Sequence, residues 1–223
     1  MRAQHRHRDD MKSIRITSVH DSGLASVVDH LRAGGLIAYP TETTYGFGCA
    51  LAESPLRILA RAKRRDPSRP FLLLVPDDWR SPDLLWTPAA LELAEEFWPG
   101  PLTLALQART GTFPAEVTAP DGTVAIRSTS HALASTIVHG LGAPMTSTSA
   151  NRPGEPPALD AAGAAREAEE LGLQAHLLVV DSGPLDASPP STLIRATADG
   201  VVVLREGVIG TDELRRVLGD AND

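Results

Sequence analysis

Short apolar runs recur along this chain, and each is stopped after a few residues by a proline, a glycine or a polar cluster. The clearest are "LIAYP" (36–40), "FLLLVP" (71–76), "LTLALQA" (102–108), "TVAIRS" (123–128), "HLLVVD" (176–181), "STLIR" (191–195) and "VVVLRE" (201–206). Buried strands take about four to eight residues, whereas helices of globular proteins take about ten or more. The runs therefore predict a fold built around a β-sheet.

Amphipathic helices are predicted between these strands. After Ser22, apolar residues recur at helical spacing as far as Leu31, and Thr87 followed by Pro88 is typical of a helix start. Further helices are expected from Ser54 and over 131–141, 160–171 and 211–219. This mixture predicts a single α/β domain with a twisted open sheet and flanking helices.

The order of the elements is not a clean strand–helix–strand alternation. The run at 36–40 is followed closely by an extended piece at 46–51, and the run at 191–195 by the one at 201–205. Strands joined by such short connections pair in antiparallel fashion. The sheet is therefore predicted to be mixed, with both parallel and antiparallel pairs.

The first twelve residues, "MRAQHRHRDDMK", are polar and show no periodicity. We expect 1–12 to form a disordered leader and 13–223 to form the domain. The leader lacks the apolar centre of a signal peptide, and no run of the sequence is apolar enough to cross a bilayer. A cytoplasmic location without a membrane partner is therefore expected.

Composition excludes several classes of site. The chain has a net charge of −7, which disfavours a broad nucleic-acid-coating surface, and its single cysteine, Cys49, makes an intramolecular disulfide impossible. Cysteine and histidine spacing does not match a zinc site, and no metal ligands are predicted. The sequence also lacks a phosphate-binding loop and a nucleophile elbow.

One basic cluster stands against the acidic background. The stretch "RILARAKRRDPSR" carries Arg57, Arg61, Lys63, Arg64, Arg65 and Arg69, opposed only by Asp66. It fits either an anion-binding surface or the solvated C-terminal end of a helix, where the helix dipole favours cations. Lys63 and Arg65 would diverge by about 200° on a regular helix, so they can face one ligand only if the chain has left the helix there. Pro67 favours that departure.

Polar residues follow several predicted strands at the point where each strand ends. They are Thr41, Arg127, the segment "STSAN" (147–151), Ser191, Thr192 and Arg205. In α/β sheets ligands bind at strand ends, and guanidinium groups bind carboxylate or phosphate bidentately. If 146–151 is extended, Ser147, Ser149 and Asn151 share one face. The residues alone predict a concave site for a small anionic ligand.

Six segments, in order, resemble those of the YrdC-like threonylcarbamoyl-AMP synthases, and the resemblance runs from about Leu24 to Gly210. They are "GGLIAYPTETTYGFGCA", "AKRRDPSRPFLLLV", "FWPGPLTL", "TVAIRSTSHALA", "STSAN", and "PSTLIR" with "VVVLREGVI". The resemblance implies a YrdC-like α/β fold with a positively charged concave face. It implies an enzyme that condenses L-threonine, bicarbonate and ATP, with Mg²⁺, into threonylcarbamoyl-AMP and pyrophosphate. The product would pass to the tRNA threonylcarbamoyl transferase complex for N6-threonylcarbamoylation of adenosine 37.

The resemblance also assigns residues. The L-threonine contacts would be Thr41, Arg127, Ser147 and Ser191, and the ATP contacts would be Lys63, Arg65, Thr123, Ser149, Asn151 and Arg205. Lys63 and Arg65 would be catalytic, because they stabilise charge at the α-phosphorus. Asp66, Arg69 and Leu74 depart from the residues common in the family. No general base is evident.

Two other interpretations stay open at this point. One is a paralogue with the same fold that binds RNA and lacks synthase activity, and the other is a module that binds an anionic metabolite without chemistry. The intact Lys63/Arg65 pair and the sequence Ser149-Ala150-Asn151 favour the enzyme. Weak contact of tRNA or double-stranded RNA with the basic cluster is compatible with all three.

Overall fold

A computed structural model describes residues 11–219 of the chain. Most of the expected leader, residues 1–10, lies outside the described residues, as do residues 220–223. The boundary expected at residue 12 differs from the structure: Lys12 begins the first strand, and the Met11 side chain packs against the core. Both residues gain partners that their local sequence does not reveal.

The sheet has ten strands in the order β1-β8-β2-β3-β7-β4-β6-β5-β9-β10. Their bounds are β1 Lys12–Arg15, β2 Leu36–Pro40, β3 Tyr45–Cys49, β4 Leu72–Leu74, β5 Leu102–Gln107, β6 Thr123–Arg127, β7 Met145–Ser149, β8 Leu177–Asp181, β9 Thr192–Thr197 and β10 Gly200–Arg205. The predicted antiparallel pairs are present as β2 with β3 and β9 with β10. Parallel pairs, such as β8 with β2 and β5 with β9, make the sheet mixed, as predicted.

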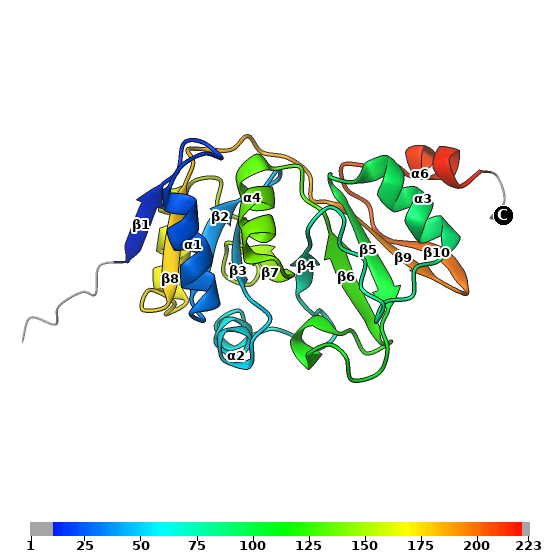
Figure 1. Cartoon of the computed structure of the whole chain (residues 1–223), viewed down its shortest axis with the longest axis horizontal. Coiled ribbons are helices and arrows are strands. Elements are labelled where there is room, and N and C mark those ends of the chain that lie inside the picture. Colours follow the sequence, from blue (N-terminus) through cyan, green and yellow to red (C-terminus); the bar gives the residue numbers. More distant parts are fainter. Residues whose placement is uncertain (1–10, 220–223) are drawn as a thin grey trace, which may run out of the picture.

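Six α-helices of the described residues cover this sheet. They are α1 Gly23–Arg32, α2 Glu53–Ala62, α3 Pro88–Phe97, α4 Ala132–Leu141, α5 Ala161–Glu170 and α6 Thr211–Leu218. Helices α1 and α4 pack together over the β8-β2-β7 half, and α3 packs on α6 at the far end (Figure 1). The Thr87 cap is confirmed, because its hydroxyl accepts a hydrogen bond from the Ala90 N–H.

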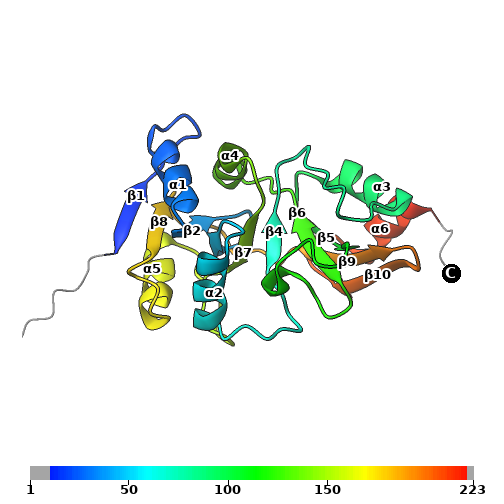
Figure 2. The same ribbon diagram turned by 60° about the horizontal axis from the view of Figure 1, so that its bottom comes forward.

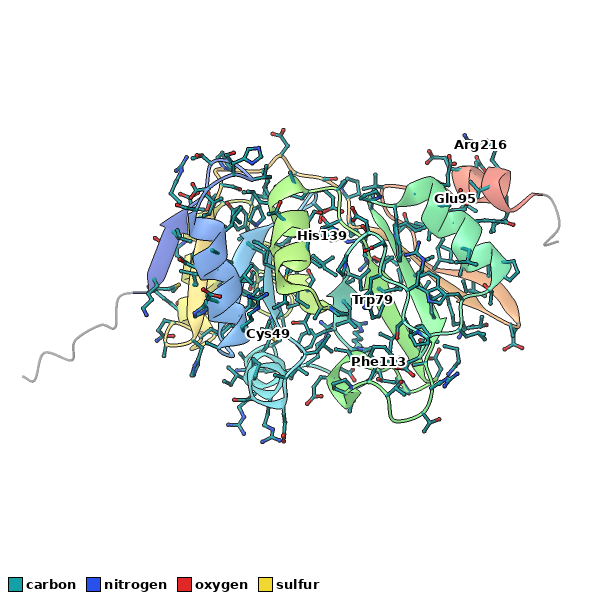
Figure 3. The ribbon with its side chains drawn as sticks, in the orientation of Figure 1. Cys49, Trp79, Glu95, Phe113, His139 and Arg216 are labelled. Atoms are coloured by element: carbon teal, nitrogen blue, oxygen red, sulfur yellow. The ribbon has the colours of Figure 1, made fainter. Side chains whose placement is uncertain are left out.

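Helices α2 and α5 lie against β3, β2 and β8 on the side away from α1 (Figure 2). Glu95 and Arg216 mark α3 and α6 at the end of the molecule opposite β1 (Figure 3). None of these helices is long and apolar enough to cross a bilayer.

Strand alternation determines which side chains meet in the middle of the sheet. In β4, Leu73 belongs to the core cluster that includes α2, α3 and α5, and Leu74 to the one beneath α1 and α4. Leu74 pairs with Arg127 of β6 and with Met145 of β7. Arg127 and Ser147, which is two residues beyond Met145, therefore project from the same face of the sheet as Leu74.

Candidate active site

Strand β7 carries the hydroxyl-rich segment, and its side chains alternate as predicted. The Ser147 hydroxyl accepts a hydrogen bond of 2.7 Å from the buried Tyr39 hydroxyl. Thr146 faces the other way, where its hydroxyl accepts a hydrogen bond from the Cys49 N–H at 3.0 Å. Ser149 donates to the side-chain oxygen of Asn151 at 2.7 Å, on the Ser147 side.

Lys63 anchors the end of this segment. Its Nζ donates to the Ser149 carbonyl at 2.9 Å, to the Asn151 carbonyl, and to Asn151 Oδ1 at 2.8 Å. The structure thus brings together three residues that sequence analysis assigned to ATP. Burial, and then the neighbouring charge of Arg65, lower the pKa of Lys63 to about 8, although Glu167 opposes this shift.

The backbone leaves the helix at Lys63, whose side chain contacts the Ser149–Asn151 segment. Helix α2 ends at Ala62, Lys63 is its C-cap, and Arg64 adopts a left-handed conformation with φ 45°. The Arg65 N–H then bonds back to the Ala60 carbonyl at 2.9 Å, which closes a Schellman motif. The predicted departure from the helix is present.

Arg65 lies beside Lys63 but has different partners. Its guanidinium stacks 4.8 Å from the centroid of the Phe71 ring and donates to the Pro70 carbonyl at 2.6 Å. Its buried Nε has no hydrogen-bond partner in the described part of the chain. Arg65 therefore keeps donor capacity for an anion, and burial lowers its pKa.

Three other arginines of the basic cluster face elsewhere. Arg57 pairs with Glu53 one helical turn away on the exposed surface of α2. Arg57, Arg61 and Arg64 line a groove of about 840 Å³ between α2 and α5, which contains none of the predicted site residues. Arg57 thus fits the solvated helix face that the sequence left open.

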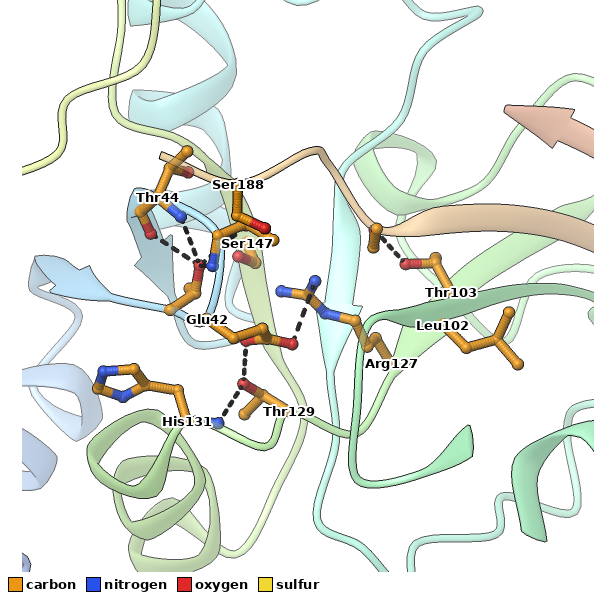
Figure 4. Close-up of polar contacts among 12 residues, drawn as sticks. Glu42, Thr44, Leu102, Thr103, Arg127, Thr129, His131, Ser147 and Ser188 are labelled. Carbon is orange, nitrogen blue, oxygen red and sulfur yellow. Dashed lines mark hydrogen bonds and ion pairs between the residues drawn. The ribbon is translucent and has the colours of Figure 1, made fainter. Parts of the chain in front are cut away.

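A buried ion pair occupies the middle of the sheet. Arg127 Nη1 lies 3.4 Å from Glu42 Oε1, and the Thr129 hydroxyl donates to Glu42 Oε2 at 2.7 Å (Figure 4). Thr41 shapes the loop that presents Glu42, because its hydroxyl donates to the Thr44 carbonyl at 2.7 Å. Neither Arg127 Nε nor Glu42 Oε1 has a hydrogen-bond partner among the described residues.

Ser191 links the predicted threonine contacts to the predicted ATP contacts. Its hydroxyl lies 2.9 Å from that of Thr103, and Arg205 Nη2 donates to the Ser191 carbonyl at 2.8 Å and to its hydroxyl at 3.1 Å. Desolvation, and then the charge of Arg127, lower the pKa of Arg205, so the two guanidinium groups act on each other. The structure joins Arg205 to a predicted threonine contact.

Thr123 is the predicted residue that stands apart. Its hydroxyl donates to Asp121 Oδ1 at 2.7 Å, and Asp121 in turn pairs with Arg195 at 3.3 Å. No hydrogen bond in the described structure ties Thr123 to Lys63 or Asn151. Its contact with ATP stays a prediction.

Sequence analysis missed several residues of this site: Tyr39, Glu42, Thr103 and Thr129. Glu42 had a signal, because it is a carboxylate within the hydroxyl-rich loop "TETTYG" that follows a buried strand. Thr103 and Tyr39 lie inside apolar runs, where they read as ordinary strand residues. Only the register of neighbouring strands brings their hydroxyls to Ser191 and Ser147.

A protein-family model named for Sua5, YciO and YrdC, and described as "Telomere recombination", matches residues 29–207. The chain belongs to this Sua5/YciO/YrdC family. The threonylcarbamoyl-AMP synthase of Alkalilimnicola ehrlichii is 36% identical over 175 residues, which cover 78% of this chain and 90% of that protein. The threonylcarbamoyl-AMP synthase of Bacillus subtilis is 34% identical over 206 residues, which cover 91% of this chain but 58% of that longer protein.

Solved members of the Sua5/YciO/YrdC family share the fold. P. abyssi Sua5 complexed with L-threonine matches with a TM-score of 0.81 and 29% identity, over 93% of this chain and 60% of that one. E. coli YciO matches with a TM-score of 0.78 and 26% identity, over 91% of this chain and 98% of that one. The predicted YrdC-like α/β fold is therefore confirmed.

Proposed function

We propose that this protein is an L-threonylcarbamoyladenylate synthase, a nucleotidyltransferase that condenses L-threonine, bicarbonate and ATP. The main support is that one segment, Ser147–Asn151, connects two cationic centres. Ser149 and Asn151 hold Lys63, while Ser147 bonds to Tyr39. Burial raises the pKa of Tyr39 far above its ordinary value, and the Ser147 bond and the nearby charge of Arg127 oppose this shift. Named relatives with this activity support the same assignment.

The Arg127 centre suits the amino acid. A buried guanidinium with an unpartnered Nε is a receptor for a carboxylate, because the planar fork binds both oxygens. In Figure 4 this guanidinium points toward Glu42 and the strand that carries Ser147. Thr41 shapes the loop that presents Glu42. Ser191 contacts Arg205, whose pKa is lowered by burial and then by the charge of Arg127. The threonine carboxylate is therefore proposed to bind at Arg127.

The Lys63 centre suits the triphosphate. Lys63, Arg65 and the Ser149–Asn151 segment are proposed to bind ATP, and Arg205 is proposed to reach it from the other side. All three Nζ donors of Lys63 are already engaged by this segment, so contact with phosphate requires it to exchange one of them. Arg65 Nε has no hydrogen-bond partner within residues 11–219, so Arg65 is proposed to need no such exchange.

Two displacements make up the proposed reaction. The ammonium of L-threonine first loses a proton to solvent. The free amine then attacks the carbon of bicarbonate, water leaves, and the resulting carbamate oxygen attacks the α-phosphorus with loss of pyrophosphate. Positioning and charge stabilisation by fixed cations carry most of the rate in phosphoryl transfers.

Mg²⁺ is proposed to arrive with ATP, where it neutralises phosphate charge. Mg²⁺ usually keeps water and phosphate ligands and needs few protein carboxylates. The described residues contain no group of three His, Cys, Asp or Glu side chains that could hold a metal. The product of the proposed reaction, threonylcarbamoyl-AMP, is proposed to feed tRNA threonylcarbamoylation in the cytoplasm.

Turnover tests the proposal directly. Pyrophosphate release from ATP should require L-threonine and bicarbonate together, and omission of either should reduce it to background. A YrdC-fold RNA-binding paralogue or an anion-binding module would bind its ligand without this release. ATP hydrolysis that ignores threonine would overturn the assignment.

A further inference from the structure

Glu42 is a buried carboxylate for which the predicted site gives no role. Its Oε2 accepts a hydrogen bond from Thr129, and the Thr129 hydroxyl itself accepts the His131 N–H at 3.2 Å. These two hydrogen bonds in series fix the carboxylate in one orientation. The other oxygen, Oε1, faces Arg127.

The pair that Glu42 forms with Arg127 is incomplete. Their closest atoms are 3.4 Å apart, longer than the roughly 2.7–2.9 Å of a strong charge-assisted hydrogen bond. The Glu42 side chain is 15% exposed and the Arg127 side chain 4%, so water supplies few of the missing hydrogen bonds. Buried charged atoms without hydrogen bonds are costly, and a ligand that satisfies both of them gains that free energy on binding.

A zwitterion has the required shape and charge. Its carboxylate matches the guanidinium of Arg127, and its ammonium, one carbon away, matches the free oxygen of Glu42. Lying alongside both groups, it forms one complete ion pair with each of them. A simple monocarboxylate offers only the first contact, and it leaves the charge of Glu42 buried without a partner.

We propose that Glu42 is the specificity-determining residue that binds the α-ammonium of the amino-acid substrate. This rests on the proposed function, in which that substrate is L-threonine. Without ligand, Glu42 neutralises Arg127 and competes with any anion for it. Glu42 therefore both selects amino acids and excludes amine-free carboxylates.

Binding measured by calorimetry tests this with two ligands that differ only at the amine: L-threonine and (R)-3-hydroxybutyrate. Glu42→Gln keeps the size of the side chain and an acceptor for Thr129 but removes the charge. We expect it to weaken L-threonine binding by about tenfold or more and to tighten (R)-3-hydroxybutyrate binding, because the competing anion is gone. Glu95→Gln, on the exposed side of α3, is the matched control and should change neither.

A purely structural role for Glu42 would weaken both ligands together, and that result would overturn the proposal. If Glu42→Gln does not fold, the wild-type protein still decides, because it should bind L-threonine at least about tenfold more tightly than (R)-3-hydroxybutyrate. Equal affinities would overturn the proposal. Wild-type protein that binds L-threonine selectively but releases no pyrophosphate would remove the proposed function and leave the role of Glu42 standing. A wild-type protein that binds no L-threonine would overturn both.

Discussion

The two ends of the candidate site differ in how completely their buried polar atoms are satisfied. Around Lys63, each Nζ donor has an acceptor on the Ser149–Asn151 segment. Around Arg127, the guanidinium and the Glu42 carboxylate face each other at 3.4 Å, and each retains an atom that forms no hydrogen bond with the part of the chain that the structure describes.

This difference separates groups that order the protein from groups that await a ligand. The Lys63 contacts join α2 to the end of β7 across more than eighty residues of sequence, so they form as part of folding. The Arg127–Glu42 pair gains little from folding, because its charges are buried but poorly paired. Substitutions at the two ends should therefore fail in different ways.

The largest effect is expected at the Lys63 end. Lys63→Ala and Arg65→Ala should each remove about 2–4 kcal/mol of transition-state stabilisation, and the double variant should lose less than the sum, because both act on one charge. Lys63→Ala should also lower thermal stability, because it frees the Ser149–Asn151 segment, whereas Arg65→Ala should lower it less. Kinetics and thermal melts of the three variants measure this.

Arg57→Ala and Arg61→Ala are the matched controls, since both lie on the same helix and line the outer groove. They should stay near wild type in kcat/KM. Equal losses in these controls would mean that the cluster acts as a diffuse field and that Lys63 and Arg65 have no special place.

A somewhat smaller effect is expected at the Arg127 end, and it should appear in binding of one substrate. Arg127→Lys keeps the charge but loses the planar fork, so the KM for L-threonine should rise on the order of 100-fold, or about 2–3 kcal/mol, with the KM for ATP little changed. Arg195→Lys, in the exposed pair with Asp121, is the control and should behave like wild type. An unchanged threonine KM in Arg127→Lys would place the carboxylate elsewhere.

The sequence predicted the scaffold better than the contacts within the site. Thr87 with Pro88 locates the start of α3, and the short connections predict the antiparallel pairs, because these signals depend on neighbouring residues. The departure of the chain from the helix near Lys63 and Arg65 was predicted from Pro67, and the structure makes it earlier, through a left-handed turn at the non-glycine residue Arg64. Local chemistry was sufficient in each case.

Contacts between distant strands were not predictable in this way. The hydroxyls of Thr103 and Ser191 meet because β5 and β9 pair in a particular parallel register, which places Leu102 opposite Thr192. Glu42 meets Arg127 because the loop after β2 reaches over to β6. Position in the sequence alone cannot show that Arg127 faces Glu42.

A moderate effect is expected from pH, again at the Lys63 end. Because burial lowers the pKa of Lys63 to about 8, this side chain loses its charge as pH rises through that value. If ATP binds only the charged form, its binding constant should fall about tenfold between pH 7 and pH 9. Lys63→Arg stays charged, so calorimetric titration with ATP should show no such fall. If the affinity of the wild-type protein for ATP does not change with pH, ATP binding does not depend on the charge of Lys63.

The lowered pKa of Lys63 acts on folding stability in the opposite direction from its effect on ATP binding. The folded pKa lies below the ordinary value of 10.5, so the unfolded chain binds more protons between about pH 8 and that value. The contribution of Lys63 to the free energy of unfolding should therefore rise with pH in this window. Urea unfolding of wild type against Lys63→Met isolates this contribution.

The smallest effect is expected at Arg64, and it tests whether the geometry at the Lys63 end is held by the backbone or by the contacts. Arg64 has φ 45°, a conformation that strains any residue with a Cβ and that glycine adopts freely. Arg64→Gly should raise the free energy of unfolding by up to about 1 kcal/mol, or the melting temperature by about 2–4 °C, without changing kcat/KM. Arg61→Gly, one turn earlier inside α2, carries the same change where the backbone is helical, and it should destabilise by about 1 kcal/mol. If Arg64→Gly instead lowers both stability and activity, the Arg64 side chain takes part in the site, and the turn that places Lys63 depends on more than its backbone.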